Sequence, residues 1–270
     1  MRFVRVIPCL LLRGAGLVKT VRFKDPTYLG DPLNTLRIFN EREVDEVVVL
    51  DIQATRQGKE PNYPLIGEMA SECFMPLTYG GGINTLAQAE RVLQLGAEKV
   101  SFNTAAVEKP DLITDAARHF GSQSIVVSID VKRAFLGGRE VVTRAGTTKT
   151  SMDPVVFARR MESSGAGEVL LTSIDRDGTM SGYDLDLIRE VSAALTIPLV
   201  ACGGAGSVAD LGSAVNHGGA SAAAAGSLFV FQGPHRAVLI SFPSRQDLDK
   251  VFTPLKAISS RPEDEQHGSP

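Results

Sequence analysis

The chain has 270 residues, 43% of them apolar, and a net charge of −3 with lysines and arginines spread along its length. That length and apolar content suffice for one large core, and the spread of basic charge argues against a nucleic-acid surface, which needs clustered lysine and arginine. No apolar run approaches the roughly 20 residues of a membrane span. The first residues also lack the apolar core and cleavage site of a signal peptide.

These features predict a cytoplasmic protein that binds neither nucleic acid nor membrane. The three cysteines, Cys9, Cys73 and Cys202, lie far apart in apolar stretches and show no CxxC spacing. This pattern is typical of reduced, buried thiols.

Short β-rich runs alternate with helical patterns along the chain. The predicted strands span residues 3–11, 46–51, 76–79, 99–102, 124–130, 168–173, 198–202 and 222–225. Several are continuous apolar runs, as expected of parallel strands that are covered on both faces. Between them, segments such as 86–95 and 154–161 have the helical period of 3.6. About eight such units, in a chain close to the typical length of about 250 residues, predict a (β/α)8 TIM barrel.

The sequence also repeats itself at one fixed offset. Three pairs of segments correspond: 75–82 with 197–204, 46–50 with 168–172, and 65–66 with 187–188. A half-barrel of four βα units, duplicated with pseudo-two-fold symmetry, accounts for such a repeat, whereas an open doubly wound sheet does not. We expect the barrel to span residues 1–254, with a small hairpin inserted at 134–150 and a disordered tail at 255–270.

Glycine and small polar residues follow several strands, at the end of the barrel where active sites of this fold lie. Glycine lets backbone N–H groups approach an anion closely, and the helix that follows adds its positive end. The repeat divides these residues into two opposed clusters, which predict an elongated ligand with a phosphate at each end. The alternative is that the glycines only form tight turns. The predicted phosphate-binding residues are Gly81, Gly82, Asn103 and Thr104 in the first cluster, and Asp177, Gly178, Gly203, Gly204, Gly226 and Ser227 in the second.

A single carboxylate stands where acid–base chemistry is expected. Asp130 ends the fifth predicted strand, where a general acid or base would stand. The repeat places Leu11 at the corresponding position of the first strand, and leucine can neither transfer a proton nor hold a charge. Chemistry that needs two opposed carboxylates is therefore compromised. The four histidines show no metal-ligand spacing, so we expect no metal and no cofactor.

Charged residues stand at the beginnings of four strands: Arg5, Glu46, Lys99 and Glu168. Two cations and two anions facing one another would close the bottom of the barrel with ion pairs. Ordinary solvated strand ends are the alternative. A buried ring of charge is costly, so its presence would indicate a gated passage rather than a gain in stability.

From residue 5 to about residue 231 the chain resembles the cyclase subunit of imidazole glycerol phosphate synthase, an enzyme of histidine biosynthesis. Matching segments include 7–10, 50–52, 76–83, 99–101, 120–123, 129–130, 165–168, 175–185 and 203–206. The resemblance implies a bisphosphorylated ribonucleotide at the mouth of the barrel, with Lys19 and Asp51 beside it. It also implies a HisH-like glutaminase on the opposite face and an ammonia gate of Arg5, Glu46, Lys99 and Glu168. Of the family's two catalytic aspartates, Asp130 is present and Leu11 replaces the other.

A divergent branch of this family is more similar still, because it shares the start at residues 7–12 and the segment at 226–231. Its association with O-antigen gene clusters implies that the barrel supplies ammonia to a separate sugar amidotransferase. We therefore predict a glutaminase-coupled ammonia conduit for amidation of a surface-polysaccharide sugar. The alternatives are a working cyclase, in which Asp51 or Asp177 replaces the missing acid, and a catalytically inactive scaffold that regulates its glutaminase.

Overall fold

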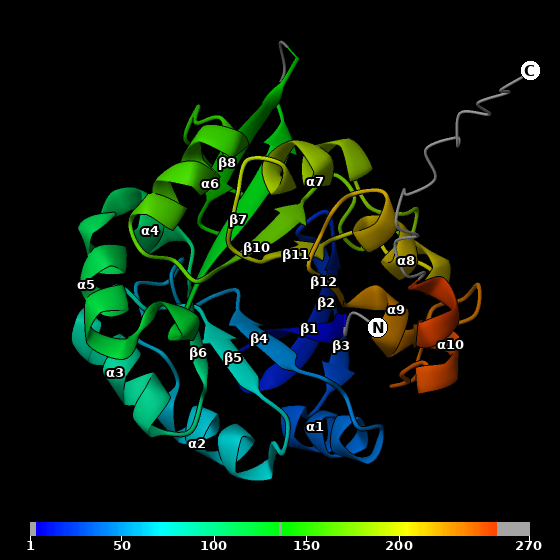
Figure 1. Ribbon diagram of the computed structural model, residues 1–270. Coiled ribbons are helices and arrows are strands. Elements are labelled where there is room, and N and C mark those ends of the chain that lie inside the picture. Colours follow the sequence, from blue (N-terminus) through cyan, green and yellow to red (C-terminus); the bar gives the residue numbers. More distant parts are fainter. Residues whose placement is uncertain (1–3, 135–136, 253–270) are drawn as a thin grey trace, which may run out of the picture.

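The computed structural model describes residues 4–134 and 137–252. Within these ranges eight parallel strands close into a barrel: β1 (Arg5–Arg13), β4 (Val47–Asp51), β5 (Leu77–Gly80), β6 (Lys99–Phe102), β7 (Ile125–Arg133), β10 (Glu168–Ser173), β11 (Leu199–Cys202) and β12 (Ala222–Ala225). Each strand pairs with the next in this order, and β12 pairs with β1 to close the ring (Figure 1). The predicted TIM barrel is confirmed, and the strand limits agree to within a few residues. Residue 3 lies outside the described residues.

Helices surround the barrel: α1 (Pro32–Glu41), α2 (Tyr63–Glu72), α3 (Leu86–Gln94), α4 (Thr104–Glu108), α5 (Asp111–Phe120), α6 (Pro154–Ser163), α7 (Leu185–Ser192), α8 (Val208–Asn216), α9 (Ser227–Val230) and α10 (Arg245–Val251). The side chains of Asp31, Thr85 and Ser207 accept backbone N–H groups and so fix where α1, α3 and α8 begin. Apolar helix faces pack on the outside of the strands in one continuous core. Among the described residues, no helix has the length and apolarity needed to cross a bilayer.

The two halves of the barrel use the same strand register. Val47 pairs with Leu77 between β4 and β5, and Val169 pairs with Leu199 between β10 and β11. These are the pairs that the sequence repeat relates. One strand earlier, Leu11 of β1 lies opposite Leu50, and Asp130 of β7 lies opposite Thr172. Leu11 and Asp130 therefore occupy equivalent positions in the two half-barrels.

Side chains inside the barrel form layers, because alternate residues of each strand point inward. The layer at the strand beginnings holds the four charged residues predicted there. Above it lies a buried apolar cluster, separate from the outer core, that includes Ile7, Val48, Val126, Leu170, Val200 and Ala222. The uppermost layer faces the end of the barrel where the strands finish, which we call the mouth.

The three cysteines are free thiols. Cys9 and Cys202 lie buried in the interior of the barrel, the lumen, and Cys73 is half-buried outside it.

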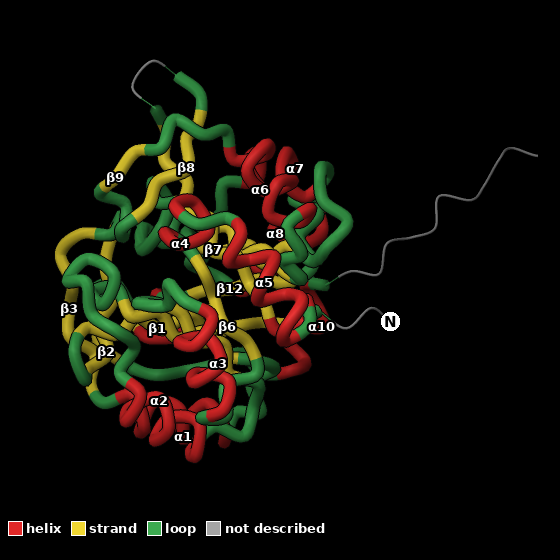
Figure 2. The backbone as a smooth tube through the Cα atoms, turned by 90° about the vertical axis from the view of Figure 1, so that its left-hand side faces the viewer, coloured by secondary structure: helices red, strands yellow, loops and turns green. Residues whose placement is uncertain are grey.

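Short antiparallel strands outside the repeat extend the described part of the chain at three places. The first, β2 (Gly16–Val21) with β3 (Lys24–Gly30), follows β1 and was not predicted, because that strand was expected to end at residue 11. The second, β8 (Arg139–Thr143) with β9 (Thr148–Lys149), continues β7 within the predicted insertion. The third joins β13 (Phe231–Gln232) and β14 (Ala237–Val238). Figure 2 shows β2, β3 and β9 on the same side of the barrel. The predicted tail at 255–270 lies outside the described residues.

Candidate active site

A cavity of about 380 Å³ opens at the mouth of the barrel. This volume is within the range of small-molecule sites, which is about 300–1,000 Å³. The structure brings together in its walls most of the predicted site residues: Lys19, Asp51, Gly81, Gly82, Asn103, Thr104, Asp130, Asp177 and Gly226. Gly178, Gly203, Gly204 and Ser227 of the second predicted cluster do not line it.

Asp130 lies near the end of β7 and is only 8% exposed. Its Oδ2 accepts a hydrogen bond from the Asn103 side-chain amide at 3.1 Å, and the same amide donates to the Ser128 carbonyl at 2.9 Å. Burial raises the pKa of Asp130 to about 7, the charge of Asp177 adds to the increase, and the Asn103 hydrogen bond opposes it. A carboxyl with this pKa is suited to give or take a proton near neutral pH.

This pKa predicts a pH-dependent effect of Asp130→Asn on stability. The carboxyl ionises near pH 3.9 in the unfolded chain and near pH 7 in the folded protein. Between those values the folded state binds the extra proton, so wild-type stability falls as the pH rises toward 7, whereas asparagine does not titrate. We expect the stability of Asp130→Asn relative to the wild type to rise by about 2.5 kcal/mol from pH 5 to pH 8, measured by urea unfolding.

The matched control is Asp186→Asn, because Asp186 is 75% exposed on α7. Its difference from wild type is expected to be the same at both pH values. A pH-independent difference for Asp130→Asn as well would mean that Asp130 titrates normally.

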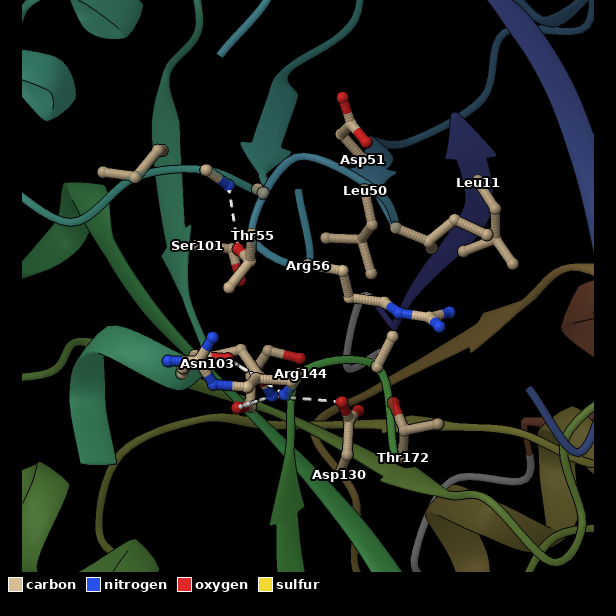
Figure 3. Close-up of a pocket in the computed structure, with 18 of the residues that line it drawn as sticks. Leu11, Leu50, Asp51, Thr55, Arg56, Ser101, Asn103, Asp130, Arg144 and Thr172 are labelled. Atoms are coloured by element: carbon tan, nitrogen blue, oxygen red, sulfur yellow. Dashed lines mark hydrogen bonds between the residues drawn. The ribbon is translucent and has the colours of Figure 1, made fainter. Parts of the chain in front are cut away.

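Among the described residues that line the cavity, no second free carboxylate faces Asp130. Leu11 and Leu50 form one wall, and Asp130 and Thr172 lie on the facing wall (Figure 3). The side chain of Leu11 is buried beside that of Val18 and other apolar residues of the lumen. The equivalent position in the other half-barrel therefore holds no group that can transfer a proton.

Asp51 and Asp177, the residues considered as replacements for the missing acid, already have partners. Asp51 Oδ1 accepts the backbone N–H groups of Gln53 and Ala54 at 2.8 and 2.9 Å, which holds the loop after β4 in place. Asp177 forms a buried ion pair with Lys19, whose Nζ lies 2.8 Å from Oδ2 and 3.0 Å from Oδ1. Each carboxylate thus stabilises a loop of the mouth.

The glycines of the first predicted cluster are required by the packing of the loops. A Cβ on Gly81 would lie 2.4 Å from the Asp51 carbonyl, and one on Gly82 would lie 2.9 Å from the Lys59 carbonyl. The N–H of Gly82 donates to Thr55 Oγ1 at 3.2 Å. The structure thus gives these residues a packing role, whereas their role in phosphate binding stays a prediction.

At the opposite end of the barrel, the four charged residues form a closed ring. Lys99 Nζ lies 3.0 Å from Glu46 Oε1 and 2.8 Å from Glu168 Oε2, and the Arg5 guanidinium binds both glutamates. The Thr78 hydroxyl also donates to Glu46 at 3.0 Å. Burial would raise the pKa of Glu168, but the hydrogen bond and charge of Arg5, together with Lys99, hold it below its ordinary value.

Sequence reasoning missed several residues at the mouth. Figure 3 shows the Arg56 side chain reaching into the cavity from the loop after β4, and Arg144 beside Asn103. The N–H of Arg144 donates to Thr104 Oγ1 at 3.1 Å, and its guanidinium binds Glu108. Phe23, at the tip of the β2–β3 hairpin, also lines the cavity. All three lie in polar loop sequence outside the repeat segments, where spacing carried no signal.

Comparisons with known proteins agree with this architecture. The model of a family described as histidine biosynthesis protein matches residues 5–235. A Pseudomonas aeruginosa protein, named as imidazole glycerol phosphate synthase subunit hisF2, is 55% identical over 245 residues, which cover 91% of this chain and 98% of the relative. A Leptospira interrogans protein named as subunit HisF is 49% identical over 249 residues (92% and 98%). The Alkaliphilus metalliredigens HisF subunit is 47% identical over 225 residues (83% and 89%). The chain therefore belongs to the histidine biosynthesis protein family, within its HisF group of imidazole glycerol phosphate synthase subunits.

Proposed function

We propose that this HisF-family barrel pairs with a glutaminase of the HisH type and conducts ammonia from the charged ring to the mouth. The observation that carries the proposal is the complete ring of Arg5, Glu46, Lys99 and Glu168 beneath an apolar lumen. The acceptor would be the sugar substrate of a separate amidotransferase, in the synthesis of a surface polysaccharide.

The route through the barrel is short. Ser101 lines the mouth cavity and lies two residues beyond Lys99 on β6, a rise of roughly 6.6 Å along a strand. The Ser101 hydroxyl is buried and has no hydrogen-bond partner among the described residues. It offers one polar contact to a small molecule passing between ring and cavity.

The lumen favours neutral ammonia over ammonium. Valine, leucine and alanine side chains line it between ring and mouth, and an unpaired cation is costly to bury in apolar surroundings.

The ring would open by movement of Lys99. Lys99 has a flexible side chain, and both glutamates keep the Arg5 guanidinium as a partner when Lys99 moves away. Opening therefore leaves neither carboxylate unpaired.

The loss of the opposed acid supports ammonia delivery over cyclisation. In this chain Leu11 faces Asp130, and the carboxylates of Asp51 and Asp177 are bound elsewhere. A working cyclase remains the second candidate, because Asp130 has a pKa of about 7 and lines a cavity large enough for a small substrate.

Lys99→Ala tests the conduit. We expect the wild-type barrel to stimulate glutamine hydrolysis by the glutaminase, and Lys99→Ala to reduce this stimulation at least about fivefold, the low end of measured couplings between sites. The measurement is glutamate release with and without barrel at saturating glutamine.

The matched control is Lys149→Ala, because Lys149 is 66% exposed on β9 at the other end of the barrel. It should stimulate like the wild type. No stimulation by the wild-type barrel would contradict the glutaminase pairing, and stimulation that is unaltered in Lys99→Ala would favour a regulatory scaffold.

A further inference from the structure

Arg56 brings an unpaired guanidinium into the mouth cavity. It lies in the loop after β4 and lines the cavity. Figure 3 shows its side chain pointing into the space between Leu11 on one wall and Thr172 on the other. Among the described residues, the Arg56 side chain has no hydrogen-bond or ion-pair partner. The guanidinium is therefore available to a ligand of the cavity.

The loop that carries Arg56 is held by hydrogen bonds on both sides of it. The Ala54 N–H donates to Asp51 Oδ1 at 2.9 Å, and the Lys59 N–H donates to the Ala54 carbonyl at 2.9 Å. The hydroxyl of Thr55, the residue next to Arg56, accepts a backbone N–H of the loop after β5 at 3.2 Å. The backbone is thus ordered before any ligand binds, which lowers the entropy lost on binding.

The acidic residues of the cavity do not neutralise Arg56. Of the four in its described lining, Asp177 and Glu108 are paired with other cations, and Asp51 accepts backbone N–H groups. The fourth, Asp130, has a pKa of about 7 because it is buried, so part of it is uncharged at neutral pH. The negative charge that matches Arg56 is therefore expected to come from a ligand.

The surroundings of Arg56 favour a carboxylate as that charge. Leu11 and Leu50 form the wall beside it, and an acid at position 11 would repel an incoming anion. A planar guanidinium binds a carboxylate through two parallel hydrogen bonds. Phosphate groups instead draw on backbone N–H groups at helix N-termini, which a wall of leucine side chains does not offer. Leucine at position 11 and arginine at position 56 thus both admit a carboxylate.

We propose that Arg56 is a specificity-determining residue of the mouth and binds the carboxylate of an acidic ligand, such as a sugar acid, beside Leu11. The ligand carboxylate would occupy the space that faces Asp130 across the cavity. The inference does not rest on ammonia conduction, because the charged ring lies at the opposite end of the barrel.

The test compares two probes that differ in one group. The six-carbon chain of 6-phosphogluconate ends in a carboxylate, where that of glucitol 6-phosphate ends in an alcohol. Binding is measured by calorimetry at low ionic strength, where charges are least screened. We expect the wild type to bind 6-phosphogluconate at least about tenfold more tightly, since hydrogen bonds between charged groups are strong, and Arg56→Gln to lose most of this preference. Arg56→Lys should keep part of it, since lysine keeps the charge without the planar fork.

Arg133→Gln is the control, because Arg133 is an exposed arginine at the end of β7 that does not line the cavity. It should keep the wild-type preference, and a loss there would overturn the proposal in favour of general surface charge.

Three further results would overturn it: no binding of 6-phosphogluconate, equal affinity of the wild type for the two probes, or an unchanged preference in Arg56→Gln. An equal loss of affinity for both probes in Arg56→Gln would also contradict it, because Arg56 would then bind the phosphate that the probes share. Thermal unfolding without ligand shows whether each variant is folded, and Arg56→Lys keeps the test valid if the glutamine variant is not.

Discussion

Replacing Leu11 by aspartate is expected to raise ammonia-dependent cyclisation of the family's bisphosphorylated ribonucleotide by about 100- to 10,000-fold over the wild type. This is the usual contribution of one positioned general acid or base. Leu11 and Asp130 pair with equivalent residues of the two half-barrels, and both line the mouth cavity. A carboxylate at position 11 would therefore face Asp130 across the space where substrate is expected. The measurement is turnover of that ribonucleotide with an ammonium salt as the nitrogen source.

Leu11→Asn is the matched control, because asparagine has the shape of aspartate and cannot transfer a proton. We expect its turnover to equal that of the wild type. If Leu11→Asp folds and still gains nothing, the mouth of this barrel has lost more than one acid. Equal gains in both variants would show that polarity, not proton transfer, was missing.

Lys19→Met is expected to lower the free energy of unfolding by about 3–5 kcal/mol, the usual cost of removing one partner from a buried ion pair. Lys19 is 4% exposed, and its ammonium group contacts both oxygens of Asp177 and the Thr20 carbonyl. Methionine fills similar space but leaves the Asp177 carboxylate buried without a cation. Urea unfolding at neutral pH measures the loss.

The double variant Lys19→Met/Asp177→Leu should recover most of that stability, because a buried ion pair replaced by apolar side chains is often neutral. Lys24→Met, at an exposed position of β3, should change stability by less than about 0.5 kcal/mol. A double variant as unstable as Lys19→Met would mean that Lys19 contributes through packing rather than through its charge.

The barrel was predictable from sequence because its strands are marked by local apolar runs and its two halves repeat at a fixed offset. Apolar runs such as the one over 47–50 identify parallel strands, and the fixed offset of the repeat identifies the closed fold. The charged ring was one of the two arrangements that strand positions allowed, the other being solvated strand ends. Glu46, Lys99 and Glu168 stand at strand beginnings, which all lie at one end of a parallel barrel, and the structure joins them with Arg5 by ion pairs.

The rest of the site depends on contacts that spacing does not encode. Asp51 was predicted to lie beside a substrate, which stays a prediction; it lines the mouth cavity, and its carboxylate also accepts backbone N–H groups of the next loop, a contact that the sequence does not indicate. Arg236, which lies between β13 and β14, donates to the Gly178 carbonyl and to Ser227 Oγ, contacts that the sequence does not indicate. Asp177 was predicted as a phosphate ligand, and the unpredicted β2–β3 hairpin brings its partner Lys19 to it. Side-chain partners across loops are set by tertiary packing.

The most direct test of the account uses the wild-type barrel in complex with its glutaminase, supplied with glutamine and the bisphosphorylated ribonucleotide together. Glutamate and the cyclised product are measured in the same reaction. We predict glutamate release that depends on the barrel, with no cyclised product. Cyclised product formed in step with glutamate would contradict the account and identify the chain as a working cyclase of histidine biosynthesis.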